Sequence, residues 1–242
     1  MKPALFLSDL HLSSVRPEAT AAFLAFAAGP ARDARAVYIL GDLFDWWLGD
    51  DQLAEPFAAA IAQALRAVSD AGVPVYVGHG NRDFLLGSQF ARMTGATLLP
   101  ETYVLDLFAV RTLLSHGDEL CTDDLDYQRY RRRARDPALQ RRLLRLPYRA
   151  RRTIAWWLRR MSRSTNALKA EAIMDVNSRA VEDAFRIHAA QRMIHGHTHR
   201  PARHEHNVDG MARERWVLAD WHDRGRYLEV DASGVRAREI DG

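Results

Sequence analysis

The sequence predicts an α/β fold, and three features of its hydrophobic pattern support this class. Residues 1–95 alternate short apolar runs with longer amphipathic stretches, which is the order strand, loop, helix. From Thr97 onward, short apolar runs follow one another without helices between them, so the sheet is expected to become partly antiparallel. Residues 123–188 have a helical pattern throughout, which predicts a helical insertion in the α/β core.

The first 95 residues contain three strand–loop–helix units. The expected strands are residues 4–8, 37–40 and 73–77. The expected helices run from Pro17 to Gly29, from about Phe57 to Gly72 and from about Phe84 to Gly95. Their ends are assigned from proline, which favours the first helical turn, and from glycine, which favours the position after the last turn. Polar loops therefore follow the carboxyl ends of all three strands.

The second half of the chain is expected to complete the core differently. Further strands are expected at residues 102–107, 110–115, 216–219, 227–230 and 235–240. Within the helical segment, Thr165 is expected to cap a long helix whose apolar stripe contains Ile173, Val176, Ala180 and Ala184. Because no Pro/Ser-rich linker interrupts the chain, residues 1–122 and 189–242 are assigned to one core and residues 123–188 to an inserted helical lobe.

Composition narrows the class of protein. With 242 residues, 48% of them hydrophobic, the chain can bury a full core. The apolar run before Asp9 is too short for a signal peptide, and no stretch reaches the roughly 20 apolar residues of a spanning helix, which favours a cytoplasmic location. The lone Cys121 excludes an internal disulfide and a cysteine-based zinc site. Any metal is therefore expected to be bound by His, Asp and Asn.

Charge is unevenly distributed. The formal net charge is +3, yet residues 129–163 contain fourteen arginines and one acidic residue, so this segment carries +13 and the remainder −10. The arginines, among them Arg149, Arg151 and Arg152, are interleaved with leucines and with Trp156 and Trp157. This pattern favours a face that docks on an anionic membrane surface and handles lipid. An amphipathic hairpin with solvated arginines and a nucleic-acid-binding face both stay open.

Side chains with metal-ligand chemistry follow five of the expected strands. Directly after the short apolar run Met193-Ile194, where a further strand is expected to end, His195-Gly196-His197-Thr198-His199 places three imidazoles within five residues. The other strand ends carry Asp9 and His11, Asp42, Asn81, and His116. Because ligand sites form at the carboxyl ends of strands in open α/β sheets, these side chains are expected to converge. Carboxylates, an amide oxygen and imidazoles suit two divalent ions such as manganese, iron or zinc, held about 3.5–4 Å apart by a shared carboxylate.

Five short motifs, D-x-H, G-D-x-x-D, G-N-x-D, H-G-D and G-H-T-H, occur in this order. Together they resemble the calcineurin-like metallophosphoesterases. The resemblance implies a four-layer αββα sandwich with two metals, one bound by Asp9, His11, Asp42 and His199 and the other by Asp42, Asn81, His116 and His197. It implies that Asp42 bridges the ions and that His195 supports the site without binding metal. Asp45 and Asp83 are candidates for orienting histidines or for capping loops.

The third motif departs from the pattern of many relatives. Where they have G-N-H-D or G-N-H-E, with a histidine that protonates the leaving oxygen, this chain has Arg82. Arginine keeps its proton at ordinary pH but can bind phosphate oxygens in a bidentate manner. A leaving group that is itself a phosphate departs without protonation, so Arg82 favours a pyrophosphate substrate. The expected catalytic residues are Asp42, Asn81, Arg82 and His116.

A narrower resemblance rests on G-D-L-F-D-W-W, H-G-N-R-D, I-M-D-V-N and H-G-H-T-H-R-P, with the basic lobe before the last. These segments are similar to the UDP-2,3-diacylglucosamine hydrolases of lipid A biosynthesis. The resemblance implies water attack at the α-phosphorus of UDP-2,3-diacylglucosamine, giving UMP and 2,3-diacylglucosamine 1-phosphate, with two Mn²⁺ ions. It implies substrate contacts at Asn81, Arg82, Asp124, Ser162, Asn166, Lys169 and His197, with Ser164 as a rival for Ser162. The expected partner is the cytoplasmic face of the inner membrane, and no nucleic acid.

Two other functions stay open at this level. A nuclease or other nucleotide phosphodiesterase could use the same metal centre, with the basic lobe gripping a polynucleotide, although the lobe has more tryptophan and leucine than phosphate contacts require. A non-catalytic membrane-surface protein could retain the fold, although the complete set of ligand-type side chains argues against it. Steep salt dependence of binding would favour the nuclease.

Overall fold

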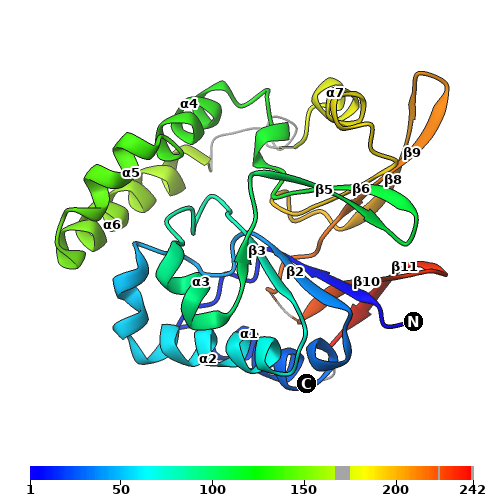
Figure 1. The fold of residues 1–242 in the computed structure, drawn as a ribbon. Helices are drawn as coiled ribbons and strands as arrows, with labels where there is room; N and C mark the ends of the chain where they lie inside the picture. Colours follow the sequence, from blue (N-terminus) through cyan, green and yellow to red (C-terminus); the bar gives the residue numbers. More distant parts are fainter. Residues whose placement is uncertain (167–174, 223, 241–242) are drawn as a thin grey trace.

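Two β-sheets packed face to face form the centre of the fold (Figure 1). The computed structural model describes residues 1–166, 175–222 and 224–240, and residues 158–166 are described by their backbone alone. The first sheet has the order β11-β10-β1-β2-β3-β4, with β1 Ala4–Leu7, β2 Ala36–Leu40, β3 Val75–Gly78, β4 Thr97–Leu98, β10 Arg226–Asp231 and β11 Gly234–Glu239. Strands β1 to β4 are parallel, and β10 and β11 extend the sheet antiparallel.

The second sheet has the order β5-β6-β7-β9-β8. Its strands are β5 Thr102–Leu107, β6 Val110–Ser115, β7 Arg192–His195, β8 Ala202–Val208 and β9 Met211–Val217. Strand β7 is parallel to both β6 and β9, whereas β5 and β8 pair antiparallel with their neighbours. The carboxyl ends of β6 and β7 therefore lie at one edge, and the mixed sheet expected from the sequence is confirmed.

Helices cover the outer faces of both sheets. On the first sheet, α1 Pro17–Ala28, α2 Pro56–Asp70 and α3 Ser88–Thr94 bury Phe23, Ile61 and Phe90 in one cluster with β1, β2 and β3. On the second sheet, α7 Ser178–His188 packs Val181 and Phe185 against β6 and β7. Strands β1 and β2 are buried along their whole length because helices cover one face and the second sheet the other. The four layers are α, β, β and α, as the resemblance to the calcineurin-like metallophosphoesterases implies.

The remaining helices form a group at one side of the sheets (Figure 1). They are α4 Leu125–Ala134, α5 Pro137–Leu144 and α6 Tyr148–Asn166. Helix α7, assigned to the same lobe by sequence, packs instead on the second sheet. The division into a core and an inserted lobe of residues 123–188 stays a prediction. No helix in the described part of the chain is long and apolar enough to cross a membrane.

The predicted helix around Thr165 is wrong. Helix α6 continues through Asn166, so Thr165 lies inside it and cannot cap a new helix. Helix α7 begins at Ser178, where the Asn177 side chain accepts from the backbone N–H groups of Arg179 and Ala180. Val176 therefore lies before α7, and Ile173 falls outside the described residues. The Asn177 cap therefore starts a new helix at Ser178, although the spacing of the apolar residues had suggested one continuous helix from Thr165.

Two other elements differ from the sequence-based expectation. Helix α3 begins at Ser88 rather than near Phe84, because the Asp50 carboxylate from a distant loop accepts from the backbone N–H groups of its first turn. The β8–β9 hairpin was predicted only near residue 216, since both strands are rich in charged residues. Its turn, Asp209-Gly210, has positive φ at both positions, and Asp-Gly is a recognised hairpin signal.

Candidate metal centre

The loops after β1, β2 and β7 have an unusual backbone conformation. Asp9, His11, Asp42, His197 and His199 all have positive φ, between 47° and 69°. Residues with a β-carbon seldom adopt this region, and doing so costs on the order of 1–3 kcal/mol each. Such strain persists only where the surrounding structure imposes it, and it clusters at functional sites. These loops therefore hold five side chains in directions that ordinary turns would not give.

Backbone hydrogen bonds join the first two of these loops. The Asp9 N–H donates to the Gly41 carbonyl at 3.2 Å, and the His11 N–H donates to the Asp42 carbonyl at 3.0 Å. Glycine is required at position 41, where φ is 95° and a β-carbon would lie 2.7 Å from both the Gly80 backbone and the His116 ring. Because β1, β2 and β3 are parallel neighbours, the loops that follow them pack closely against one another.

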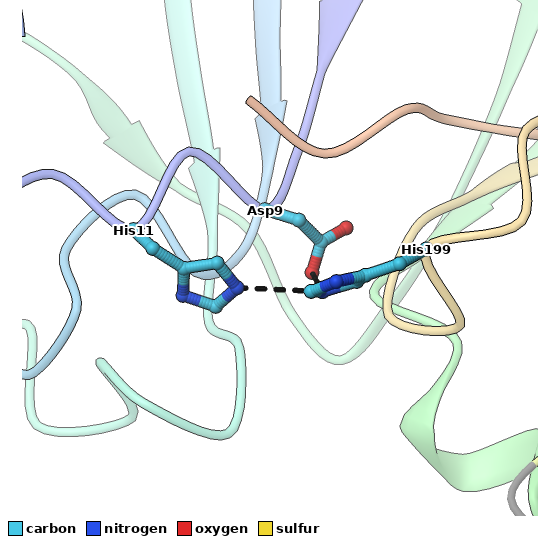
Figure 2. A group of neighbouring side chains, drawn as sticks. All are labelled: Asp9, His11 and His199. Atoms are coloured by element: carbon cyan, nitrogen blue, oxygen red, sulfur yellow. Dashed lines mark hydrogen bonds and ion pairs between the residues drawn. The ribbon is translucent and has the colours of Figure 1, made fainter. Parts of the chain in front are cut away.

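Asp9, His11 and His199 form the first group of possible ligands (Figure 2). The Nε2 atoms of His11 and His199 are 3.4 Å apart, and His199 Nε2 lies 3.4 Å from Asp9 Oδ1. The other oxygen, Asp9 Oδ2, accepts from the His197 backbone N–H at 2.8 Å. Asp9 Oδ1 is buried and has no hydrogen-bond donor among the described residues. A buried carboxylate oxygen that faces two imidazoles is suited to a cation.

Asp42, Asn81, His116 and His197 form the second group. Asn81 Oδ1 lies 3.1 Å from His116 Nε2 and 3.0 Å from His197 Nδ1. The other ring nitrogen of His116, Nδ1, donates to the Leu40 carbonyl at 2.9 Å, which leaves Nε2 with its lone pair toward the centre. These side chains come from the ends of β2, β3, β6 and β7, so both sheets contribute to the centre.

Asp42 lies between the two groups. Its Oδ2 is 3.8 Å from His11 Nε2 and 3.9 Å from His116 Nε2. Its Oδ1 accepts from the Arg82 backbone N–H at 2.8 Å, which fixes the carboxylate plane. Asp42 is therefore placed to contribute to both groups, as expected of a bridging ligand.

In this centre, nearby carboxylates raise the pKa of His116 and raise that of His199 to about 10 in spite of burial, whereas burial favours neutral rings at His11 and His197. Burial lowers the pKa of His11 to about 3 and the pKa of His197 to about 4, because a charged ring would lose its solvation. A neutral imidazole keeps the lone pair that a metal requires. Burial also raises the pKa of Asp42 to about 7, and a bound cation would restore the ionised form. Two carboxylates, one amide and four imidazoles thus fit divalent cations, as the sequence predicts.

Buried polar side chains support these loops from behind. His195 has no exposed surface, its Nδ1 lies 2.9 Å from the carbonyl of the next residue, and its Nε2 lies 3.0 Å from Arg215 Nη1. Because a guanidinium only donates, His195 Nε2 must accept and Nδ1 carries the proton. Asp83 accepts from the backbone N–H groups of Leu43 and Gly80, both at 2.8 Å. Asp83 therefore joins two loops by capping them and does not orient a histidine.

Sequence reasoning missed Asp220. Its Oδ2 lies 3.3 Å from His199 Nδ1, on the ring edge opposite Nε2. A carboxylate in this position holds a ligating histidine in one tautomer and one orientation. The available signal was its position: Asp220 follows the end of an expected strand, as the other polar residues of the centre do. It lacked a motif, and only the fold brings it to His199.

The expected substrate contacts are only partly described. The Arg82 side chain is exposed while its backbone N–H is bonded to Asp42. Asp124 is buried and caps α4, where its Oδ1 accepts from the Tyr127 N–H at 3.0 Å. The side chains of Ser162, its rival Ser164 and Asn166 lie in the part of α6 described by backbone alone, and Lys169 lies outside the described residues. These contacts stay predictions.

Comparison with known proteins identifies the class. Residues 2–201 match the calcineurin-like phosphoesterase family, and the chain belongs to that family. Members use a centre of two divalent ions, and the described residues include the candidate ligand groups for it. A structure described as a novel archaeal phosphodiesterase covers 98% of this chain and 99% of its own, but with 11% identity and a TM-score of 0.48 it is too distant to inform function.

Curated relatives narrow the comparison further. A UDP-2,3-diacylglucosamine hydrolase of Edwardsiella ictaluri is 51% identical over 237 residues, which cover 98% of this chain and 91% of the relative. A UDP-2,3-diacylglucosamine hydrolase of Aromatoleum aromaticum is also 51% identical, over 96% of this chain and 94% of its own. The identity thus extends through the helical segment as well as through the metal centre, in agreement with the resemblance noted from the motifs.

Proposed function

We propose that this protein is a metal-dependent hydrolase that cleaves the pyrophosphate of UDP-2,3-diacylglucosamine, releasing UMP and 2,3-diacylglucosamine 1-phosphate (lipid X). The observation that carries the proposal is the position of Asp42 Oδ2 between two groups of ligand-type side chains. Centres with two metals act on phosphate esters and anhydrides by in-line displacement. The substrate is taken from relatives that are 51% identical across nearly the whole chain.

The proposed metal ligands follow the two groups. One ion is assigned to Asp9, His11, Asp42 and His199, and the other to Asp42, Asn81, His116 and His197. This assignment is supported by the buried Asp9 Oδ1, which faces His199 Nε2 at 3.4 Å, and by the position of Asp42 between His11 and His116. We propose Mn²⁺ for both ions, because the motifs resemble those of the UDP-2,3-diacylglucosamine hydrolases; oxygen and imidazole donors without thiolate are compatible with manganese and equally with iron or zinc.

The chain's own side chains position the reaction. When bound, two divalent ions supply the Lewis acidity that activates water and neutralises charge on the phosphoryl group. Asn81 Oδ1, held within 3.1 Å of His116 and 3.0 Å of His197, keeps the second group directed at one small volume. Asp42, held by the Arg82 N–H, keeps the two groups together. Water attacks the α-phosphorus, the bond to the bridging oxygen breaks, and the lipid phosphate leaves with that oxygen.

Arg82 is proposed to bind the substrate phosphates. Its backbone is fixed at both polar groups, because its N–H donates to Asp42 Oδ1 at 2.8 Å and its carbonyl accepts from the Trp47 N–H at 3.0 Å. Its side chain is exposed at the rim of the centre. An exposed guanidinium on a fixed backbone can bind two phosphate oxygens and stabilise the leaving phosphate as an anion. No proton donor is then required at this position.

A cavity between the helical group and the core is proposed to receive part of the acylated substrate. Its volume is about 440 Å³, within the usual range of ligand pockets. Leu85, Leu86 and Leu99 of the core line it together with Leu144 of α5. His79, two residues before Asn81, also lines it, so the cavity adjoins the loop of the metal centre. The lining also includes Glu101, Arg135 and Gln140, so the cavity is apolar on one side only, and this leucine-lined side supports a lipid substrate over a polynucleotide.

We further propose that α6 docks on the cytoplasmic face of the inner membrane. Ile154, Trp156 and Trp157 are 39%, 50% and 56% exposed, and Arg149 and Arg152 beside them are exposed as well. Exposed tryptophan interleaved with exposed arginine suits an anionic bilayer surface. Arg151 does not belong to this exposed face of α6: it is buried and donates to the Leu48 carbonyl and to Asp51. The sequence-based grouping of all three arginines is therefore corrected.

The function is tested with purified protein, Mn²⁺ and three substrates: UDP-2,3-diacylglucosamine, bis-p-nitrophenyl phosphate and single-stranded DNA. We expect UMP to be released from the first substrate far faster than product from either of the others. In ¹⁸O-labelled water the label is expected in UMP, because attack is proposed at the α-phosphorus. Label in the lipid phosphate would instead show that water attacks the phosphorus bonded to the diacylglucosamine. Preferential cleavage of DNA would replace this function by the nuclease alternative.

A further inference from the structure

A buried carboxylate beside the metal centre has no part in the proposed mechanism. Asp118 lies two residues after His116, and its side chain is 1% exposed. Its Oδ2 accepts from Tyr127 Oη at 3.0 Å, from Arg131 Nε at 2.9 Å and from Arg135 Nη2 at 3.4 Å. The three donors are four residues apart, so they lie along one face of α4 and its carboxyl-terminal cap. The single Asp118 carboxylate therefore holds α4, from its first turn to its carboxyl-terminal cap, against the loop after β6.

The same face of α4 is joined to other segments of the core. Arg135 Nη2 also lies 3.3 Å and 3.4 Å from the carbonyls of the two residues before Asn81, to which it donates. Arg131 Nη2 and Arg135 Nε each lie 3.2 Å from the carboxylate of Glu101. Helix α4 is thus connected to the ends of β3 and β6, both of which are followed by ligand-type side chains.

Tyr127 brings this network to the metal centre. Its ring centroid lies 5.6 Å from that of His197, with the planes tilted by 32°. The Tyr127 hydroxyl donates to Asp118, so one bond fixes the ring against the imidazole. The Tyr130 ring lies 6.3 Å further along and is 43% exposed, which continues the aromatic surface toward solvent.

We propose that Asp118 is a positioning residue that holds α4 so that Tyr127 forms a fixed wall beside His197, against which the substrate binds. This inference rests on the proposed function, because it assumes that the substrate lies between α4 and the metal centre. The Asp118 carboxylate is the buried anion paired with two largely buried guanidinium groups, whose other acidic partner, Glu101, is 48% exposed. Asparagine has the same shape but loses the charge and turns one N–H toward the donors.

The test compares Asp118→Asn with Tyr127→Phe, which keeps the ring but removes its bond to Asp118. The matched control is Asp126→Asn on the same helix, where the exposed carboxylate pairs locally with Arg129. Four quantities are measured: KM and kcat for UDP-2,3-diacylglucosamine, turnover of bis-p-nitrophenyl phosphate, bound Mn²⁺ per chain, and hydrogen exchange of the amides of α4.

We expect Asp118→Asn to raise KM for UDP-2,3-diacylglucosamine by a factor about ten times larger than the factor by which it lowers turnover of bis-p-nitrophenyl phosphate. The Mn²⁺ content should be retained, and the amides of α4 should exchange faster. Tyr127→Phe is expected to raise KM about threefold, since one neutral-donor bond is lost. The control should match the wild type. Equal losses of metal and of both activities would show that Asp118 only supports the metal loop, and unchanged KM and exchange in both variants would remove the positioning role.

The outcome is separable from the proposed function. If the wild-type protein does not cleave UDP-2,3-diacylglucosamine, the function fails, while amide exchange and metal content still decide whether Asp118 fastens α4. If Asp118→Asn does not fold, Tyr127→Phe tests the proposal by itself. Wild-type KM and wild-type amide exchange in Tyr127→Phe would contradict the proposal that the Tyr127 ring is held beside His197 as a binding surface.

Discussion

Replacing Asp220 with asparagine is expected to weaken metal binding at one of the two sites. Asp220 Oδ2 lies 3.3 Å from His199 Nδ1, and His199 Nε2 faces Asp9 and His11. The carboxylate holds the proton on Nδ1 and so keeps the Nε2 lone pair directed at the first group. Asparagine can still accept the bond but lacks the charge that makes the imidazole a stronger donor to the metal.

The expected magnitude follows from the exposure of the pair. Loss of a partner that orients a metal-binding histidine typically reduces metal affinity 10- to 100-fold. The His199 side chain is 34% exposed and that of Asp220 is 20% exposed, so solvent screens part of the interaction. We therefore expect the lower end of the range, about tenfold, which corresponds to about 1.4 kcal/mol. The second site, which has no contact with Asp220, should keep its affinity.

The assay is calorimetric titration of the metal-stripped protein with Mn²⁺, which resolves two binding steps without relying on activity. The matched control is His222→Ala, because His222 Nε2 lies 3.6 Å from Asp220 Oδ2 yet is 65% exposed. Wild-type affinity in Asp220→Asn would refute the orienting role. If His222→Ala weakened binding equally, then His199, Asp220 and His222 would themselves be a ligand group, a geometry that their close approach allows.

Three further predictions concern the centre and the helical group. Asp42→Ala should nearly abolish activity and lower metal content at both sites, because its Oδ2 lies between the two groups; full Mn²⁺ occupancy by elemental analysis would contradict the bridging role. Arg82→His should not raise turnover of the pyrophosphate substrate, since departure of a phosphate needs no proton; a clear gain in kcat would reinstate the acid. Arg149→Gln with Arg152→Gln should weaken binding to anionic liposomes by about 1 kcal/mol per charge while turnover in detergent survives, and unchanged liposome sedimentation would exclude α6 as the docking face.

Local patterns determined the class of this protein. Strands β1 and β2 are buried on both faces and read as continuous apolar runs, so their positions and the polar loops after them follow from hydrophobicity alone. The histidines, aspartates and asparagine of the centre were identifiable because each lies within a few residues of the end of an expected strand. Chemical type and order along the chain thus sufficed to name the candidate ligands, since parallel strands bring their carboxyl ends to one edge within each sheet.

Tertiary structure alone decided which polar side chains meet across the chain. Asp220 reaches His199, Asp118 gathers three donors from α4, and Arg151 is buried among basic neighbours that are exposed. Hydrophobic periodicity reports whether a residue lies on an apolar face, but an aspartate or arginine reads as solvated unless its partner is known. A buried charge is stable only when paired, and its partner comes from a segment that folding, not spacing in the sequence, places beside it.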